Sequence, residues 1–189
     1  SYSFVSGPPA MEESMKTEMK VGVVWPAYVR DDHRAELRRF VPPHVGLHMR
    51  GTVLEPSTEP EDITLQRALD EAGSSDIEDA AGALVPTGVA SIGYGCTSIS
   101  YIRGVVGERD IVRRMAESTG LPVTTTSGAV STALHHLSVE RVAVLSPHID
   151  SMNERLHTFL EESGFGVVNL VGLNMRADIE ELPPREILD

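Results

Sequence analysis

The sequence predicts an α/β fold with two lobes, each built from a parallel sheet flanked by helices. Apolar, β-branched runs alternate with helix-like segments along most of the chain. This alternation is typical of parallel sheets covered by helices. The pattern restarts near residue 121, so we expect a first lobe over 21–120 and a second over 121–189. The second lobe ends as its third helix begins, and we expect its C-terminal part to be missing.

The first lobe is predicted to hold three units, each a strand followed by helical sequence. In chain order they are a strand over 21–25, a helix over 31–40, a strand over 47–54, helical sequence over 62–84 interrupted near 73–75, a strand over 89–94 and a helix over 102–118. Pro26 ends the first strand because proline has no backbone N–H for a neighbouring strand. Gly120, with Pro122 shortly after it, ends the last helix.

The second lobe repeats the alternation over a shorter stretch. Its predicted elements are a short strand over 123–126, a helix over 128–137, a buried strand over 141–145, a helix near 151–163, a strand over 167–171 and the opening of a helix at 183–189. Ser127 is the candidate N-cap of the first of these helices. Ser151 and Glu154 have the spacing of a capping box, and Gly164 ends that second helix.

Composition and charge exclude several classes of protein. The 189 residues include 16 basic and 28 acidic side chains, a formal net charge of −12. Binding to nucleic acid or to an anionic membrane uses clustered lysine and arginine, so we expect neither partner. The apolar runs are too short to cross a bilayer. Residues 1–20 resemble a flexible tail without the apolar core of a signal peptide. A single cysteine excludes an internal disulfide and indicates the cytoplasm.

Cys96 is the residue whose surroundings point most clearly to chemistry. It lies in the segment 93–98 (GYGCTS), where a strand gives way to small and hydroxyl residues. A thiol that follows a strand and faces a helix start can have its pKa lowered by the helix dipole and by free N–H groups. We therefore predict a nucleophilic Cys96, with Thr97 and Ser98 as donors to an anion. The alternative is a packing role, since free cysteines are often buried and inert.

Other polar residues follow strands at the edge where parallel sheets bind ligands. Pro26 follows the first strand, His148 follows the strand over 141–145, and Ser127 adjoins three threonines at a helix start that could hold an anion. The structural alternatives are capping for Ser127 and a solvated loop position for His148. The sequence has no phosphate-binding loop, dinucleotide fingerprint or typical metal-ligand spacing. We expect no cofactor and no metal.

Three segments together resemble one known family. They are 95–104 (GCTSISYIRG), 121–130 (LPVTTTSGAV) and 141–156 (RVAVLSPHIDSMNERL). In order and spacing they resemble the maleate cis–trans isomerase and arylmalonate decarboxylase group of the aspartate/glutamate racemase superfamily, and the similarity spans about residues 20–185. The resemblance implies two pseudo-symmetric, Rossmann-like lobes with the active site in the cleft between them. It also implies an enzyme without metal or organic cofactor.

The resemblance implies roles for individual residues. In the cis–trans isomerases of this group, a cysteine attacks the double bond of a cis-dicarboxylate, the adduct rotates about the new single bond, and elimination releases the trans isomer. Cys96 matches this nucleophile. Thr97 and Ser98 match groups that hold a substrate carboxylate, and Pro26 matches a pocket proline. His148 stands where the family usually has a tyrosine.

The sequence therefore favours a cofactor-independent, maleate isomerase-like enzyme that acts on a small dicarboxylate, with a homodimer or homotetramer as the family-based expectation. Racemases and isomerases of the group use two cysteines, and the second would follow the segment matched here. The decarboxylases have glycine in place of the first, so Cys96 favours an isomerase or racemase. The alternatives are an amino-acid racemase, an arylmalonate decarboxylase-like lyase (including relatives that break down compatible solutes such as ectoine) and a non-catalytic binding relative.

Overall fold

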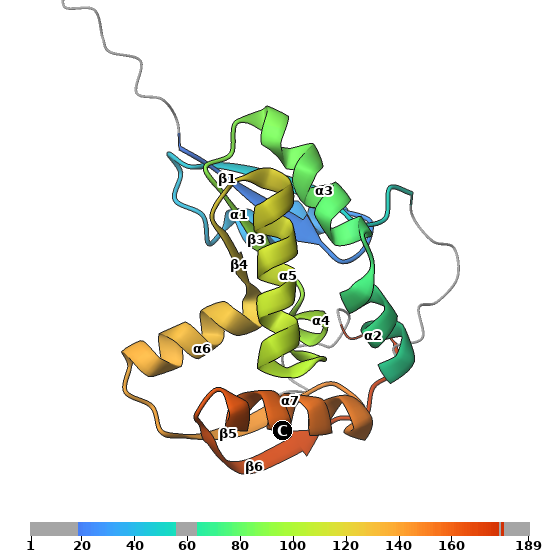
Figure 1. Ribbon diagram of the computed structural model, residues 1–189, viewed down its shortest axis with the longest axis vertical. Helices are drawn as coiled ribbons and strands as arrows, with labels where there is room; N and C mark the ends of the chain where they lie inside the picture. The colour runs from blue at the N-terminus through green and yellow to red at the C-terminus, as the bar shows by residue number, and fades with distance from the viewer. Residues whose placement is uncertain (1–18, 56–63, 178, 180–189) are drawn as a thin grey trace, which may run out of the picture.

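The computed structural model describes residues 19–55, 64–177 and 179, which form two parallel sheets with helices around them (Figure 1). Sheet A has the strand order β2-β1-β3-β4, and sheet B pairs β5 with β6. The strands are β1 Lys20–Trp25, β2 Gly46–Gly51, β3 Ser91–Tyr94, β4 Val123–Thr125, β5 Arg141–Ser146 and β6 Gly166–Gly172. All strand pairs are parallel, which confirms the predicted α/β class. The predicted tail at 1–20, apart from its last two residues, and the predicted helix at 183–189 lie outside the described residues.

Helices pack on both faces of sheet A. The α-helices of the described residues are α1 Asp31–Arg38, α2 Leu65–Gly73, α3 Asp76–Leu84, α4 Thr97–Tyr101, α5 Gly104–Thr119, α6 Thr126–His136 and α7 Asp150–Glu162, of which α7 packs against sheet B. α3 contacts β1 and β2, and α5 contacts β4 (Figure 1). On the opposite face the ring of His33 from α1 packs on Trp25, with ring centroids 4.9 Å apart. No helix in the described ranges combines the length and apolar character that a membrane span requires.

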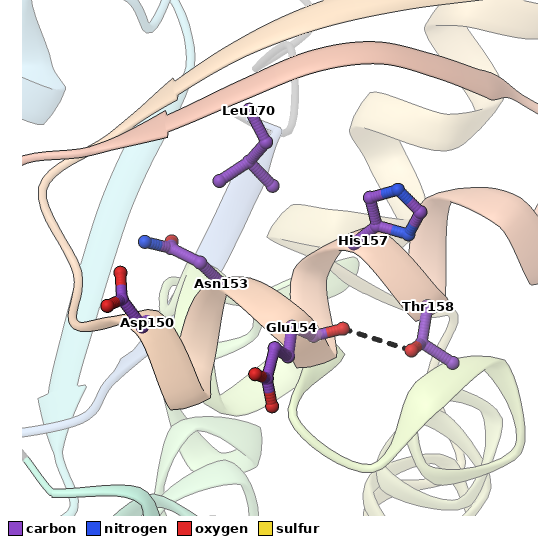
Figure 2. A pocket seen from close by; sticks show the side chains of 6 residues that line it. All are labelled: Asp150, Asn153, Glu154, His157, Thr158 and Leu170. Atoms are coloured by element: carbon purple, nitrogen blue, oxygen red, sulfur yellow. Dashed lines mark hydrogen bonds between the residues drawn. The ribbon is translucent and has the colours of Figure 1, made fainter.

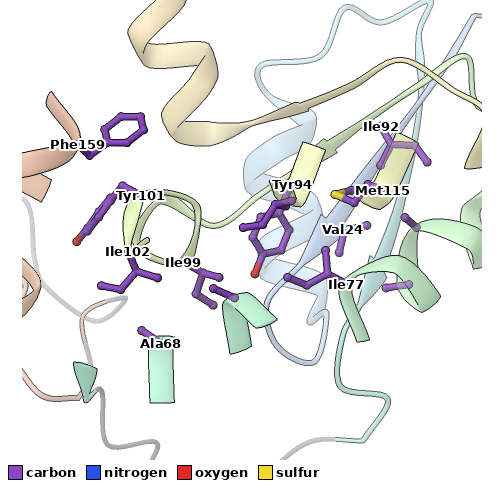
Figure 3. Packing of buried hydrophobic residues seen from close by; sticks show 14 of the residues in the cluster. Val24, Ala68, Ile77, Ile92, Tyr94, Ile99, Tyr101, Ile102, Met115 and Phe159 are labelled. Carbon is purple, nitrogen blue, oxygen red and sulfur yellow. The ribbon is translucent and has the colours of Figure 1, made fainter. Parts of the chain in front are cut away.

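The core lies between sheet A and the α3–α5 layer. Alternate residues of β1 and β3 are buried, as expected when successive side chains of a strand point to opposite faces. Val24, Ile92 and Tyr94 meet Ile77 and Met115 there (Figure 3). Burying each such side chain contributes about 1.5–3 kcal/mol relative to leaving it exposed. This packing fixes the strand ends on which the candidate site is built.

The helical sequence after Cys96 begins earlier than predicted. We expected a helix from about residue 102, but α4 starts at Thr97 and a break at Arg103 separates it from α5. Gly104 permits the break because its φ is +68°. A Cβ at this glycine would lie 2.5 Å from Glu162 Oε2, the atom that accepts a hydrogen bond from the Val105 N–H at 2.9 Å. A five-residue helix is too short to show a periodic sequence pattern.

Two predicted helix caps are wrong. Thr125, not Ser127, caps α6, and its Oγ1 accepts a hydrogen bond from the Gly128 N–H at 3.0 Å. The predicted capping box at Ser151 does not form because α7 begins one residue earlier, at Asp150. The Asp150 N–H donates instead to Asn174 Oδ1 at 3.2 Å. This partner follows β6 and could not be identified from local sequence.

Two predictions about the second half of the chain also need correction. β5 was expected to be buried, but from Arg141 to Leu145 its side chains alternate between exposed and half-buried, and Leu145 is 52% exposed; Ser146 alone in this strand is buried. Within the described ranges sheet B consists of two strands, with α7 packed against β6. β4, which we assigned to the second lobe, pairs with β3 and therefore lies in sheet A. The domain boundary near residue 120 stays a prediction.

Candidate functional site

The carboxyl ends of three neighbouring strands bring predicted site residues to one edge of sheet A. β1 and β4 lie on either side of β3, with Tyr94 paired to Val24 on one side and to Thr125 on the other. Pro26 and Cys96 follow the ends of β1 and β3, and Ser127 follows β4 by two residues. Their common edge is the one at which ligands bind in parallel α/β sheets.

A tight turn holds Cys96 between β3 and α4. Gly95 passes close to β1 there, because a Cβ on it would lie 3.1 Å from both the Trp25 ring and Val23 Cγ1, and these side chains would have to shift slightly. Cys96 is the N-cap residue of α4, has extended backbone angles and is half-buried. Its sulfur lies 3.6 Å from Ser98 Oγ and also accepts hydrogen bonds from the N–H groups of Ser98 and Ile99. These donors favour the thiolate form.

Ser127 is buried and holds α4 against the start of α6. Its Oγ accepts a hydrogen bond from Ser100 Oγ at 2.7 Å and donates one to the Thr97 carbonyl at 3.0 Å. Thr126 Oγ1 adds a hydrogen bond to the Tyr94 carbonyl at 3.0 Å. The structure therefore brings Ser127 to the predicted edge, and its hydroxyl is engaged in positioning Thr97. Thr97 itself is exposed and Ser98 is half-buried.

The electrostatics of Cys96 differ from the expected effect of a helix start. Burial raises the pKa of the thiol, and the hydrogen bonds from Ile99 and Ser98 lower it by less. α4 is only five residues long, so few aligned peptide dipoles oppose the burial. Burial also raises the pKa of Tyr94, and the negative charge of a Cys96 thiolate raises it further. At neutral pH the free site therefore holds a protonated thiol.

The raised pKa predicts slow alkylation of Cys96 near neutral pH. We expect the rate with iodoacetamide to rise with pH and to reach its midpoint above about 8.5, the value of a free thiol. The folded protein keeps the proton after the unfolded chain has lost it, so this group's contribution to stability is lost as pH rises from about 8.5. The same titration in urea serves as the control. A folded-state midpoint at or below the urea value would contradict the burial argument.

His148 approaches the site from the second sheet. It follows β5, and its ring meets that of Tyr101 edge-on, with centroids 6.4 Å apart. The backbone N–H of His148 donates to Ser146 Oγ at 3.2 Å, and its backbone carbonyl accepts a hydrogen bond from Asn153 Nδ2 at 2.8 Å. Burial lowers the pKa of His148, so its imidazole is neutral at pH 7. His148 is therefore fixed against α4 and is not a solvated loop residue.

Two hollows on the described surface do not contain the predicted residues. The first, of about 430 Å³, lies between α7 and β6 (Figure 2). It is lined by Asp150, Asn153, Glu154, His157, Thr158 and Leu170. The second, of about 470 Å³, lies between α5 and α6 and includes Glu108 and Glu162. Within the described ranges no group of three histidine, cysteine or acidic side chains is arranged to hold a metal ion.

Four residues around the site were missed by sequence reasoning. Ser100 is a hydrogen-bond partner of Ser127, and Asn153 is one of His148. The other two are Tyr94 and Tyr101, whose pKa values are raised by the negative charge of a Cys96 thiolate as well as by burial. Tyr94 alone had a sequence signal, because it precedes the Gly-Cys turn and occupies the buried face of β3. Ser100 has a partner 27 residues away, which local sequence does not reveal.

The chain is similar in sequence to two kinds of known enzyme, a decarboxylase and an isomerase. The sequence profile described as arylmalonate decarboxylase matches residues 65–187. The arylmalonate decarboxylase of Bordetella bronchiseptica is 40% identical over 92 residues, which are 49% of this chain and 38% of that protein. The maleate isomerase of Pseudomonas putida is 28% identical over 81 residues, which are 40% of this chain and 32% of that protein.

A solved structure shows the same arrangement of elements. The crystal structure of a double mutant of arylmalonate decarboxylase in the liganded form has a TM-score of 0.70 and is 28% identical, covering 84% of this chain and 63% of that one. The aligned part of the chain spans less than two fifths of the two curated relatives, 38% and 32%. The similarity therefore covers both described sheets of this chain and only part of each relative.

Proposed function

Because the chain belongs to the arylmalonate decarboxylase family of the Asp/Glu racemase-like superfamily, we propose that it acts as a cofactor-independent cis–trans isomerase of a small dicarboxylate, with Cys96 as the nucleophile. One observation carries the proposal. The Cys96 thiol lies at the carboxyl edge of sheet A with hydrogen-bond donors from Ser98 and Ile99 around its sulfur. A sulfur in this setting can accept and release negative charge without a metal.

The proposed reaction needs no net supply of protons. With maleate as the substrate, the Cys96 sulfur bonds to one olefinic carbon, and the electron pair of the double bond binds a proton at the other carbon. The thiol loses one proton and the carbon gains one, so a thiol that is neutral in the free site suits the addition. Rotation about the new C–C single bond follows. Loss of that proton and cleavage of the C–S bond then restore the double bond in the trans form and return a proton to Cys96.

The surrounding residues have proposed roles in binding. Thr97 and Ser98 would hold one substrate carboxylate through their hydroxyl and N–H groups, since charge-assisted hydrogen bonds of this kind are strong. The neutral imidazole of His148 would donate one further hydrogen bond. Pro26 would line the pocket at the end of β1. Ser127 would act through Thr97, whose carbonyl it holds at 3.0 Å.

The proposal is tested by following the olefinic proton signals of maleate and fumarate by NMR with the purified protein. We expect the maleate signal to be replaced by that of fumarate, with no added cofactor. Aspartate, glutamate and phenylmalonate are assayed in parallel by optical rotation and by release of carbon dioxide. Turnover of one of these without fumarate formation would replace the isomerase proposal.

A second candidate is a decarboxylase acting on a malonate-type diacid. It is supported by the 40% identity with the Bordetella decarboxylase, which exceeds the 28% identity with the Pseudomonas isomerase. Release of carbon dioxide from phenylmalonate would favour it. Binding of maleate without any turnover would favour a non-catalytic relative.

A further inference from the structure

The hydroxyl group of Tyr101 is buried and has no hydrogen-bond partner in the part of the chain that the structure describes. Tyr101 is 0% exposed, and no hydrogen-bond partner for its Oη lies among the described residues. Figure 3 shows its ring near Phe159, with the hydroxyl directed away from Ile99 and Tyr94. A buried hydroxyl without a partner costs about 1–3 kcal/mol, and such groups are rare in folded proteins. The packing of this side chain would be served equally well by phenylalanine, so the oxygen needs another explanation.

A second polar atom without a partner lies on the facing ring. His148 Nδ1 is buried and unbonded among the described residues, and its ring meets that of Tyr101 edge-on at 6.4 Å between centroids. The two rings come from different parts of the fold, one from α4 and one from the loop after β5. Each backbone is fixed independently, that of α4 by Ser127 and that of His148 by Asn153. The backbones that carry the two atoms are therefore held in place, while neither atom bonds to a residue that the structure describes.

The position of Tyr101 connects this pair of atoms to Cys96. Cys96 and Tyr101 are the N-cap and last residues of α4, so their Cα atoms lie roughly 7–8 Å apart at 1.5 Å per residue. Burial raises the pKa of Tyr101, and the negative charge of a Cys96 thiolate raises it further. The phenol therefore stays protonated, and it is close enough to the sulfur for a charge there to affect its pKa.

We infer that Tyr101 is a specificity-determining residue of this site, and that its Oη–H, together with His148 Nδ1, binds the second carboxylate of a dicarboxylate substrate. The inference rests on the proposed function, in which Thr97 and Ser98 hold the first carboxylate. A carboxylate offers two acceptor oxygens, which suit a phenol O–H and the N–H of an imidazole in the corresponding tautomer. A monocarboxylate of the same shape would leave both atoms without a partner.

The test compares Tyr101→Phe with the unmodified side chain in a Cys96→Ala background, where no turnover consumes the probe. Binding is measured by titration calorimetry with maleate and with cis-crotonate, in which a methyl group replaces one carboxylate. We expect Tyr101→Phe to raise the Kd for maleate about tenfold or more, because hydrogen bonds to charged groups are the strong ones. The Kd for cis-crotonate should stay the same, and the melting temperature should stay the same or rise.

The possible results separate this inference from the proposed function. Maleate binding that is equal with and without the Tyr101 hydroxyl would overturn the inference alone. An equal loss of affinity for both probes, or a lower melting temperature with unchanged affinity, would show a structural role for the hydroxyl and also overturn it. Failure of the Cys96→Ala protein to bind maleate at all would overturn the proposed function, and this inference with it.

Discussion

Replacing Cys96 with alanine is expected to abolish maleate turnover, with a loss of at least about a thousandfold, while the protein stays folded. The proposed adduct forms through the sulfur, and removing a nucleophile removes the covalent route entirely. The side chain is half-buried, and its sulfur lies 3.6 Å from Ser98 Oγ. The stability cost should therefore be small, about 1 kcal/mol. Turnover is measured by NMR and folding by circular dichroism.

The matched control for this prediction is Cys96→Ser, which keeps the size and polarity of the side chain. A serine hydroxyl is far less nucleophilic than a thiol without an adjacent base. We therefore expect this variant to be inactive as well, and to bind maleate with an affinity similar to that of the unmodified protein. Full activity in either variant would refute the role of Cys96 as the nucleophile. It would also leave the raised thiol pKa as a consequence of packing alone.

Replacing Arg114 with methionine is expected to have the largest effect on stability. Its guanidinium donates to Asp110 and Glu78 and to the carbonyls of Ala72 and Ser74, so it links α2, α3 and α5. The side chains of Arg114 and Glu78 are only 17% and 18% exposed. Methionine would leave the Glu78 carboxylate and the two carbonyls without their donor. We expect a loss of about 3 kcal/mol in the free energy of unfolding, measured by urea denaturation.

The neighbouring residue on α5 provides the control. Arg113 also pairs with Asp110 and in addition with Glu117, but its side chain is 56% exposed. Surface ion pairs contribute about 0–1 kcal/mol, so Arg113→Met should change the free energy of unfolding by less than about 1 kcal/mol. Comparable losses in the two variants would contradict the argument from burial. They would indicate that net charge, and not the links between helices, sets the stability of α5.

The order of strands and helices could be predicted because hydrophobic periodicity and turn residues within each segment determine it. A β-branched run ended by Pro26 gave the first strand, and alternating burial along β3 matches the expected period of two. The turn before Cys96 was also a local inference, because Gly93 and Gly95 allow the backbone to turn sharply after a strand. Short elements escaped this reasoning. α4 spans only Thr97–Tyr101, which is too few residues for a helical period to appear.

Tertiary structure decided the contacts of the candidate site residues. Ser127 looked like a helix cap from its neighbours, yet its partner is Ser100, 27 residues away. His148 looked like a loop residue, and its contact with Tyr101 depends on how the second sheet packs against α4. The pKa of Cys96 follows from burial, which a segment of sequence does not reveal. Partners so far apart in the chain are set by strand order and packing.

The sequence by itself determined the α/β class, the placement of Cys96 after a strand, and the segments that carry the family resemblance. These properties depend on periodicity, turn residues and motif order, which are local. Only the tertiary structure decided that β4 joins sheet A, that Ser127 positions α4, and that the hydroxyl of Tyr101 lies buried beside His148. Each of these features depends on contacts between residues that are far apart in the sequence. Such contacts, and the burial from water that they produce, exist only in the folded chain.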